Sequence, residues 1–310
     1  MKTMTNATRS VTHFVLLGFP SLSPPLRLCL CSLLAVCYAL TLLGNLCIMW
    51  AVLHDPHLGR LPMYILLGNF SWLELCYVTT TAPRMLYDLM SPAGAISFQS
   101  CFLQFYFFFS LGATECLLLS AMALDRYLAI CHPLRYPMLM SHRYCLALVT
   151  CCWVTGFLWF MMPIVMVSRL PFCGPNLDHY VCDLGPLLAA SCSPAPVTNT
   201  VCSVSNVLII FSTLSFIVGS YTAVLRAVVR LPSAEGRRKT FSTCSSHLAV
   251  VSLFYGSIMV TYISPEASGG SNKVVALCYT VVTPLLNPLI YSLRNKEMKQ
   301  ALRRTLLRRH

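Results

Sequence analysis

The chain has 310 residues, of which 56% are hydrophobic and 10% are charged, and its formal net charge is +12. Soluble domains carry about 25% charged and about 45–50% apolar residues, so this composition excludes a soluble fold. It also excludes a disordered chain, a collagen and a coiled coil, because each needs polar, glycine-periodic or charge-rich sequence.

Seven apolar stretches are each long enough to form a membrane-spanning helix, which needs about 20 mostly apolar residues to cross about 30 Å of hydrocarbon. They cover residues 27–52, 62–86, 99–130, 144–168, 198–229, 240–263 and 273–293. We therefore predict an all-α membrane protein, a seven-transmembrane helix bundle built as one domain over residues 1–310. The basic and apolar residues after 294 predict a short amphipathic C-terminal helix on the inner leaflet.

The N-terminal segment, residues 1–26, lacks the compact apolar core of a signal peptide, so we expect the first span to act as the insertion signal. Asn6 begins an N-glycosylation sequon, Asn6-Ala7-Thr8, which predicts that this segment is extracellular. The protein is therefore expected to be a glycosylated, multi-pass protein of the plasma membrane.

Lys and Arg residues are divided unequally between the two sides of the predicted bundle. The side that holds the first, third and fifth connections and the tail 294–310 has 16 of them, and the other side has six. Positive residues collect on the cytoplasmic side, so we predict an extracellular N-terminus and a cytoplasmic C-terminus. The basic excess then faces anionic membrane lipids, and we expect no nucleic-acid partner.

Two carboxylates, Glu74 and Glu115, lie in the middle of predicted spans, where ionisable groups are costly and often functional. Asn45 and Asn287 are expected at a similar depth in neighbouring spans. Two interpretations stay open: a polar cluster that binds a sodium ion or a proton, or two neutral carboxylic acids hydrogen-bonded within the bundle. No other cofactor is expected.

Four cysteines fall on the extracellular side, where disulfides persist. Cys101 begins the third span, and Cys173, Cys182 and Cys192 lie in the long connection 169–197. Four cysteines allow three pairings, and their positions do not choose between them. The connection is predicted to be an ordered, cross-linked extracellular loop.

Three segments resemble signatures of the odorant receptors, within the rhodopsin-like (class A) G-protein-coupled receptors. Residues 122–131 read MALDRYLAIC, residues 239–248 read KTFSTCSSHL and residues 284–291 read PLLNPLIY. The loop with three cysteines resembles that of the tetrapod-type (class II) branch. The resemblance implies an odorant ligand, a stimulatory olfactory-type G protein that raises cyclic AMP, accessory trafficking proteins and the cilia of olfactory neurons.

The resemblance also implies two disulfides, Cys101–Cys182 and Cys173–Cys192. A metal site has been suggested in this family at a motif that His179-Tyr180-Val181-Cys182-Asp183 matches. A sulfur ligand must be a thiolate, which a disulfide cannot provide, so no metal is expected.

An activation switch is predicted at the cytoplasmic end of the third span, at Asp125-Arg126-Tyr127. Asp125 would hold Arg126 in the resting state, whereas in the active state Arg126 would turn toward Tyr221, with His247 placed beside them as the resemblance implies. Alone, such a pair could be simple interfacial anchoring.

The seventh span completes the predicted switch. Pro288 removes a backbone donor and loosens the helix at Asn287, so that Tyr291 can rotate inward. The presence of this second motif favours a switch over anchoring.

The predicted ligand pocket lies between the outer halves of the third, fifth, sixth and seventh spans. Its residues are mainly apolar with a few hydroxyl and amide groups, which is typical of small-molecule sites and predicts a small neutral ligand. The candidates are Phe105, Phe108, Phe109, Gly112, Ala113, Cys116, Ser205, Asn206, Ile209, Ile210, Tyr255, Ile258, Met259, Tyr262, Ala276, Leu277 and Thr280.

Three other classes of protein compete with a receptor. A seven-span transporter or channel is the alternative, but inverted repeats and paired broken spans are not visible in the sequence. An enzyme is disfavoured, because the chain has no Gly-x-Ser-x-Gly motif, zinc-type histidine cluster or paired carboxylates at catalytic spacing. A retinal-binding protein would need a lysine in the middle of the last span, and Lys273 lies at its outer edge.

Overall fold

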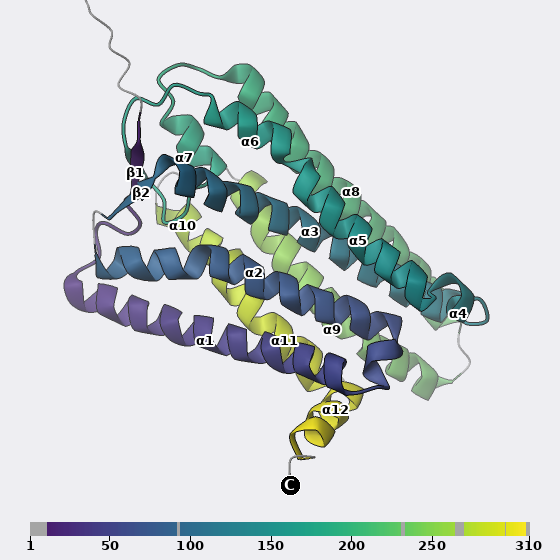
Figure 1. Ribbon diagram of the computed structural model, residues 1–310. Helices are drawn as coiled ribbons and strands as arrows, with labels where there is room; N and C mark the ends of the chain where they lie inside the picture. The colour runs from purple at the N-terminus through teal and green to yellow at the C-terminus, as the bar shows by residue number, and fades with distance from the viewer. Residues whose placement is uncertain (1–10, 92–93, 231–232, 264–269, 295, 308–310) are drawn as a thin grey trace, which may run out of the picture.

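A computed structural model describes residues 11–91, 94–230, 233–263, 270–294 and 296–307. Seven long helical segments in this part of the chain pack side by side into one bundle (Figure 1). They are α1 (Pro24–His54), α2 (Pro62–Met90), α3 (Phe98–Cys131), α5 (His142–Trp159) with α6 (Met161–Ser168), α8 (Pro196–Val229), α9 (Ala234–Ile263), and α10 (Gly270–Leu277) with α11 (Thr283–Arg294).

These seven segments coincide with the seven predicted spans, and most extend a few residues beyond them. Among the described residues, five are long and apolar enough to cross a membrane: α1, α3, α5 with α6, α8 and Lys273–Tyr291. Of the other two, α2 contains polar residues such as Glu74, and the apolar part of α9 in the described residues is the shorter stretch Cys244–Val260. The predicted all-α seven-helix bundle is therefore confirmed.

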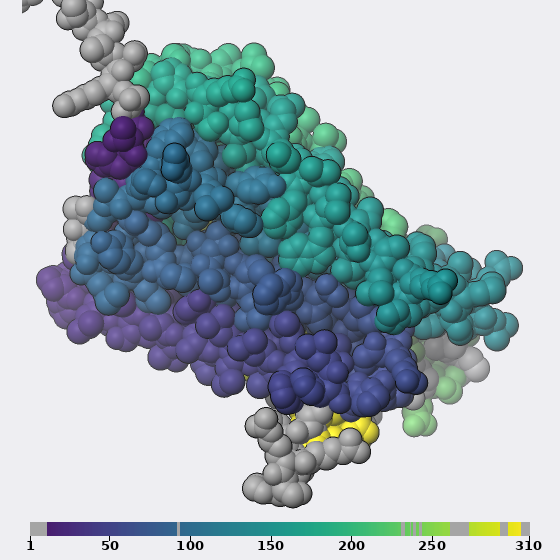
Figure 2. Space-filling model, viewed as in Figure 1, coloured from purple at the N-terminus to yellow at the C-terminus, as the bar shows by residue number. Residues whose placement is uncertain are grey.

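The outer face of the bundle is apolar, the reverse of a soluble protein. Leu43 on α1 and Leu158 on α5 are each 60% exposed, whereas Thr41 and Asn45 on the inner side of α1 are buried. Figure 2 shows this outer surface on the side formed by α1, α2 and α5. Such a surface suits hydrocarbon, with the backbone polar groups satisfied inside each helix.

Two glycines let helices approach more closely than a side chain would allow. A Cβ atom on Gly156 of α5 would lie 2.8 Å from the backbone nitrogen of Thr114 in α3. A Cβ atom on Gly44 of α1 would lie 2.9 Å from Cγ of Pro288 in α11. Small residues drive such contacts in membranes, where van der Waals packing holds helices together.

One end of the bundle, which we call the sheet end, carries a small three-stranded sheet that the sequence did not lead us to expect. β1 (His13–Leu16) pairs antiparallel with β2 (Ala95–Ser97) and parallel with β3 (Asn176–Leu177), in the order β2-β1-β3. Phe14 and Leu16 point into the core and are almost fully buried. Residues 15–17 of the N-terminal segment are thus hydrogen-bonded to the long loop.

The opposite end, which we call the tail end, carries α4 (Tyr136–Leu139), the short 3₁₀ turn Leu58–Arg60 and α12 (Lys296–Leu307) (Figure 1). The predicted C-terminal amphipathic helix is α12, and it buries Met298 and Ala301 against the bundle. Two polar contacts fasten it there, as described below.

The Asp55 carboxylate follows α1 and holds the tail end together. It accepts backbone N–H bonds from His57 and Leu58 at 3.0 and 3.4 Å, and Arg304 of α12 donates to it at 2.9 Å. Burial acts to raise the pKa of Asp55, but these hydrogen bonds and the Arg304 charge outweigh it and lower the pKa. A second contact joins the Tyr64 hydroxyl to Glu297 at 2.8 Å.

Candidate functional site

A cavity of about 50 Å³ lies among the helices toward the sheet end. It is lined by apolar and aromatic side chains with a few polar atoms, and none of its lining residues is charged. The cavity has room for only a few water-sized groups. Its walls are Tyr77, Phe108, Phe109, Gly112, Ala113, Cys116, Phe160, Asn206, Ile209, Ile210, Phe254, Ile258 and Tyr279.

The structure brings most of the expected α3 and α8 residues to this cavity. A Cβ atom on Gly112 would have nothing within 4 Å, so this glycine faces open space. On α3 the cavity is lined by Phe108, Phe109, Gly112, Ala113 and Cys116, and on α8 by Asn206, Ile209 and Ile210.

Several other expected pocket residues lie elsewhere. Phe105 packs on Phe109 with its ring centroid 4.9 Å away, and the Ser205 carbonyl accepts a hydrogen bond from Trp159. Thr280 bonds the Tyr180 hydroxyl at 3.2 Å. Leu277 and Ala276 do not line the cavity, and the side chain of Tyr262 lies outside the described residues.

Only some of the α9 residues expected in the pocket line this cavity. Phe254 and Ile258 face the cavity, whereas Tyr255 and Met259 are one residue further around the helix and face α8. The Tyr255 hydroxyl donates to Thr213 of α8 at 2.8 Å. One residue turns a helix by about 100°, so adjacent positions serve different surfaces.

Four lining residues were missed by sequence reasoning: Tyr77, Phe160, Phe254 and Tyr279. Tyr77 stacks on Phe108 at 5.3 Å, and Phe160 meets Phe109 edge-on at 5.2 Å. Phe254 precedes Ile258 by one turn and could have been found by extending that face. The other three give no signal, because Tyr77 and Phe160 lie in spans two and four, outside the predicted pocket, and Tyr279 lies in an irregular turn.

The loop between α6 and α8 closes the sheet end of the bundle. The disulfide Cys101–Cys182 ties it to α3, and Cys173–Cys192 closes a ring within it; these are the same pairs that the resemblance implies. Gln104 of α3 accepts a hydrogen bond from the backbone of Cys182 at 3.1 Å. Such cross-links restrict the unfolded chain and stabilise the folded loop.

Polar contacts fix the same loop to the N-terminal segment and to α10. The Lys273 ammonium donates to Asp178 of the loop at 2.6 Å and to the carbonyl of Gly18 at 2.8 Å. The loop also contains α7 (Leu184–Ala189), which Asp183 caps.

The proposed metal motif has no free thiolate, because Cys182 is in a disulfide. His179 Nδ1 accepts a hydrogen bond from the backbone of Val181 at 3.3 Å. Burial lowers the pKa of His179 below its ordinary value, opposed by Asp183 and helped by Lys273, so the ring is neutral. These contacts account for the motif as loop structure.

A buried polar cluster lies between α2, α3 and α11. Asn287 donates a hydrogen bond to Glu74, which connects α2 with α11. Glu74 Oε2, Glu115 Oε1, Asn287 Oδ1 and the Tyr291 hydroxyl are buried and have no hydrogen-bond partner among the described residues. Buried polar atoms are normally paired, so a cluster with several open positions calls for an explanation.

Asn45 does not join this cluster through a hydrogen bond in the described part of the chain. Its side-chain amide donates to the carbonyl of Thr41, one turn earlier in α1, at 3.0 Å. The α10–α11 segment is locally widened by a π-helical turn, Cys278–Val282, where Thr283 bonds the Cys278 carbonyl. Pro288 lies inside α11, one residue after Asn287.

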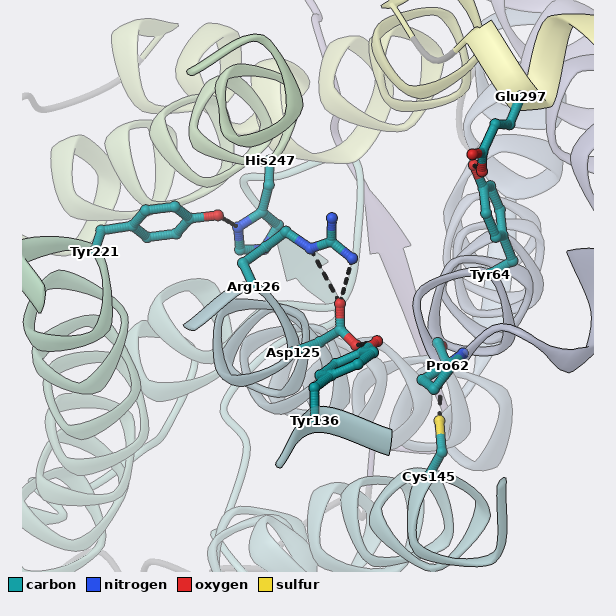
Figure 3. A network of polar contacts seen from close by, with 9 residues as sticks. All are labelled: Pro62, Tyr64, Asp125, Arg126, Tyr136, Cys145, Tyr221, His247 and Glu297. Atoms are coloured by element: carbon teal, nitrogen blue, oxygen red, sulfur yellow. Dashed lines mark hydrogen bonds and ion pairs between the residues drawn. The ribbon is translucent and has the colours of Figure 1, made fainter. Parts of the chain in front are cut away.

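At the tail end, Asp125 and Arg126 of α3 form an ion pair, with Arg126 Nε 3.0 Å from Asp125 Oδ2 (Figure 3). Tyr136 of α4 donates to the other carboxylate oxygen at 2.7 Å. Burial and the Asp125 charge raise the pKa of Tyr136, which keeps it a donor. Asp125 is fully buried and thus depends on these two partners.

On the other side of Arg126, Tyr221 of α8 bonds His247 Nδ1 of α9 at 2.7 Å (Figure 3). The structure therefore holds Arg126 on Asp125, the arrangement expected for the resting state. Tyr127 takes no part in this pair, because its hydroxyl bonds His132 at 3.1 Å. Tyr291 packs edge-on against Phe70 with ring centroids 6.0 Å apart.

Known proteins match this chain over nearly its whole length. The olfactory receptor family model matches residues 34–309. Human olfactory receptor 11H6 is 56% identical over 299 residues, which cover 96% of this chain and 90% of that receptor. Human olfactory receptor 11G2 is 57% identical over 296 residues, covering 94% of this chain and 85% of that receptor.

A solved structure has the same fold. Squid rhodopsin is 17% identical and superposes with a TM-score of 0.72, covering 92% of this chain and 81% of the rhodopsin chain. Family members are receptors and not enzymes, and the match disfavours a transporter or channel. The chain belongs to the olfactory receptor family of G-protein-coupled receptors, multi-pass plasma-membrane proteins with odorant ligands and G-protein partners.

Proposed function

We propose that a small neutral odorant binds in the 50 Å³ cavity and that its binding activates a stimulatory G protein, which raises cyclic AMP. The observation that carries this proposal is the uncharged lining of the cavity between α3, α8 and α9. An ion would lose its hydration there without a partner, whereas an alcohol, aldehyde, ketone or ester can use Asn206. The cavity must widen for larger odorants.

Gly112→Leu tests this site. The leucine side chain would project into the open space beside Gly112 and fill the cavity without meeting the backbone. Cells that express this variant should lose the cyclic AMP response to every odorant that activates the unchanged receptor. The response is measured across an odorant panel at matched surface expression.

Gly219→Leu is the matched control for this experiment. Gly219 on α8 also has nothing within 4 Å of a Cβ position, and it faces the outside of the bundle. This variant should respond normally. An unchanged response in Gly112→Leu would exclude this cavity as the odorant site.

We also propose that the sheet end is extracellular and the tail end cytoplasmic, in the ciliary membrane of olfactory neurons, with accessory trafficking proteins assisting delivery. The 16-to-6 division of Lys and Arg supports this orientation. Asn6, outside the described residues, would then be glycosylated. Glycosidase treatment should increase the electrophoretic mobility of the receptor, and Asn6→Gln should remove that increase.

Location and orientation can be tested together with an N-terminal epitope tag. Antibody should stain the cilia of unpermeabilised olfactory neurons, and co-expressed trafficking proteins should increase staining of other cells. Staining only after permeabilisation would reverse the orientation.

The buried cluster of Glu74, Glu115 and Asn287 is proposed to hold a sodium ion or a proton. Its unpaired oxygen atoms fit either, because both supply a positive partner to a carboxylate. The thermal unfolding midpoint of the purified receptor should rise in sodium chloride relative to N-methylglucamine chloride if sodium binds. If a proton binds, the midpoint should follow pH and ignore sodium.

Glu115→Gln should abolish whichever dependence is found, because the amide cannot replace the carboxylate charge. Glu235→Gln, at an exposed position near the start of α9, should leave it intact. A midpoint that responds to neither sodium nor pH would contradict the proposal.

A further inference from the structure

A second cavity, of about 570 Å³, lies between α8 and α9, and we call it the α8–α9 cavity. It is separate from the 50 Å³ cavity proposed for the odorant, which we call the odorant cavity. Phe254 and Ile258 of α9 line the odorant cavity, whereas Tyr255 and Met259 line the α8–α9 cavity. Its volume falls within the range of about 300–1,000 Å³ that is usual for small-molecule sites.

The described residues that line the α8–α9 cavity are all uncharged. Its apolar walls include Val218 of α8 and Phe241 of α9, which are 56% and 50% exposed on the outside of the bundle, where the bilayer lies. A hydrophobic molecule dissolved in the bilayer can therefore enter sideways between the two helices. A charged molecule would lose its hydration there without gaining a partner from the lining.

One polar group of the lining, the Ser252 hydroxyl of α9, is left available for a ligand. Hydroxyl groups within helices often donate to the carbonyl one turn earlier, as Thr222 of α8 does at 2.7 Å and Ser257 of α9 does at 2.8 Å. The Ser252 hydroxyl makes no hydrogen bond to any residue that the structure describes. Because an unpaired hydroxyl is unfavourable in apolar surroundings, a ligand that accepts its hydrogen bond gains affinity.

Open space lies beside this hydroxyl. Gly256 follows Ser252 by four residues and also lines the cavity, and a Cβ atom on it would meet nothing within 4 Å. Met259 continues the same face of the helix, because residues four and seven apart lie one above the other. This wall of α9 thus combines a donor, an open middle and an apolar end.

A phospholipid acyl chain does not complement this wall. Ser252 follows Thr240 by 12 residues, which is about 18 Å along the helix and places Ser252 in the middle of the predicted span 240–263. The ester groups of a phospholipid lie at the membrane surface, so only its methylene groups reach this depth. A small molecule that carries a carbonyl group on an apolar body can both fill the space and accept from Ser252.

We propose that the α8–α9 cavity is a second ligand site, which takes a small uncharged ketone or ester from the bilayer. Its carbonyl oxygen accepts a hydrogen bond from Ser252, and its apolar body lies along Gly256 and Met259. The bilayer delivers such a ligand, because molecules of this kind partition from water into hydrocarbon.

A ligand in this position favours the resting arrangement of the switch. Along α9, Ser252 lies between two residues that bond α8: Tyr255, which donates to Thr213 at 2.8 Å, and His247, which bonds Tyr221 at 2.7 Å. These bonds set the spacing of the two helices and with it the shape of the cavity. A ligand that fits this shape binds this arrangement more tightly and shifts the equilibrium toward it. It therefore inhibits the receptor, an effect that rests on the proposed function, whereas the binding does not.

Benzophenone is the probe for this site, because it is an uncharged ketone that attaches to nearby C–H bonds when illuminated. The full-length receptor is illuminated with benzophenone in phosphatidylcholine nanodiscs, and mass spectrometry locates the adducts. Met259 should be labelled about fivefold more than Met162, which is 59% exposed on the outside of α6. Comparing two methionines separates occupancy from the ready reaction of benzophenone with this residue type.

Matched serine variants test the hydrogen bond. Ser252→Ala removes the donor and leaves the space, so labelling of Met259 should fall about fivefold. Ser257→Ala is the control, because that hydroxyl is already bonded within α9, and it should leave the labelling unchanged. Gly256→Leu fills the open space and should remove the labelling. If Gly256→Leu does not fold, the two serine variants still decide the result.

Gly112→Leu separates this site from the odorant cavity. It fills the odorant cavity and should leave the labelling of Met259 unchanged. Loss of that labelling would show that Met259 reports the odorant cavity, which would overturn the proposal. Equal labelling of Met259 and Met162, as for a molecule merely dissolved in the bilayer, would overturn it too, and so would unchanged labelling in Ser252→Ala.

The inhibitory effect is measured in cells. Benzophenone should lower the cyclic AMP response to an activating odorant, and Ser252→Ala should weaken that inhibition. Equal inhibition of both receptors would exclude an inhibitory role for the α8–α9 cavity. Labelling in nanodiscs needs neither an odorant nor a G protein, so failure of the proposed function would leave that result intact.

Discussion

Gly156→Leu should prevent the receptor from reaching the cell surface in a folded form. The α5 helix meets α3 at this glycine, and a Cβ atom would lie 2.8 Å from the nitrogen and 2.9 Å from the Cα atom of Thr114. The obstacle is backbone, which cannot turn aside as a side chain can. The two helices must separate, at a cost of about 3 kcal/mol or more.

Surface antibody staining and the thermal unfolding midpoint measure this effect. Gly219→Leu is again the control, because its side chain would face outward without a neighbour, and its staining and midpoint should be normal. Gly156→Ala should give an intermediate loss. Normal staining and an unchanged midpoint for Gly156→Leu would show that α3 and α5 do not pack as closely as described.

Arg126→Ala should abolish the cyclic AMP response while some receptor remains at the surface. The arginine is held between the Asp125 carboxylate and the Tyr221–His247 pair, where a movement of α8 and α9 would reach it. Its loss also leaves Asp125 buried with Tyr136 as partner, which lowers stability. The response is therefore compared at equal surface expression, adjusted by the amount of transfected DNA.

Arg143→Ala provides the matched control, because it removes an exposed arginine near the same end of the bundle. It should signal normally. Tyr136→Phe separates the two roles of the network: it removes one hydrogen bond from Asp125 but keeps the ion pair. A full response from Arg126→Ala would place the switch elsewhere.

Hydropathy was sufficient to locate the seven spans, because the length of each is imposed by the bilayer and not by its neighbours. It was harder to predict which face of each helix points into the bundle. The exposed face of a membrane helix is as apolar as its buried face, so hydrophobicity does not distinguish Phe254, which was missed, from Tyr255, which was predicted to line the cavity. Only the packing of α9 against α8 separates them.

Two further features were not predicted from the sequence. The β1 strand is only four residues long, and it forms because residues near 96 and 176 offer backbone partners. The fourth span, predicted as one helix, is interrupted at Phe160, which places that ring on Phe109. Pro163 lies three residues further on and has no backbone donor for the carbonyl of Trp159, which accounts for the break.

The two sides of the tail end differ in the contacts that a movement of the helices would break. On the α1–α2 side, Asp55–Arg304 and Tyr64–Glu297 fasten α12, so movement there would break polar contacts. Between α8 and α9 lies a cavity of about 570 Å³ with a mainly apolar lining, and lipid tails are as apolar as the side chains they would replace. An outward swing of α9 would break the Tyr221–His247 and Tyr255–Thr213 hydrogen bonds but no ion pair, and the rest of the movement exchanges hydrocarbon for hydrocarbon.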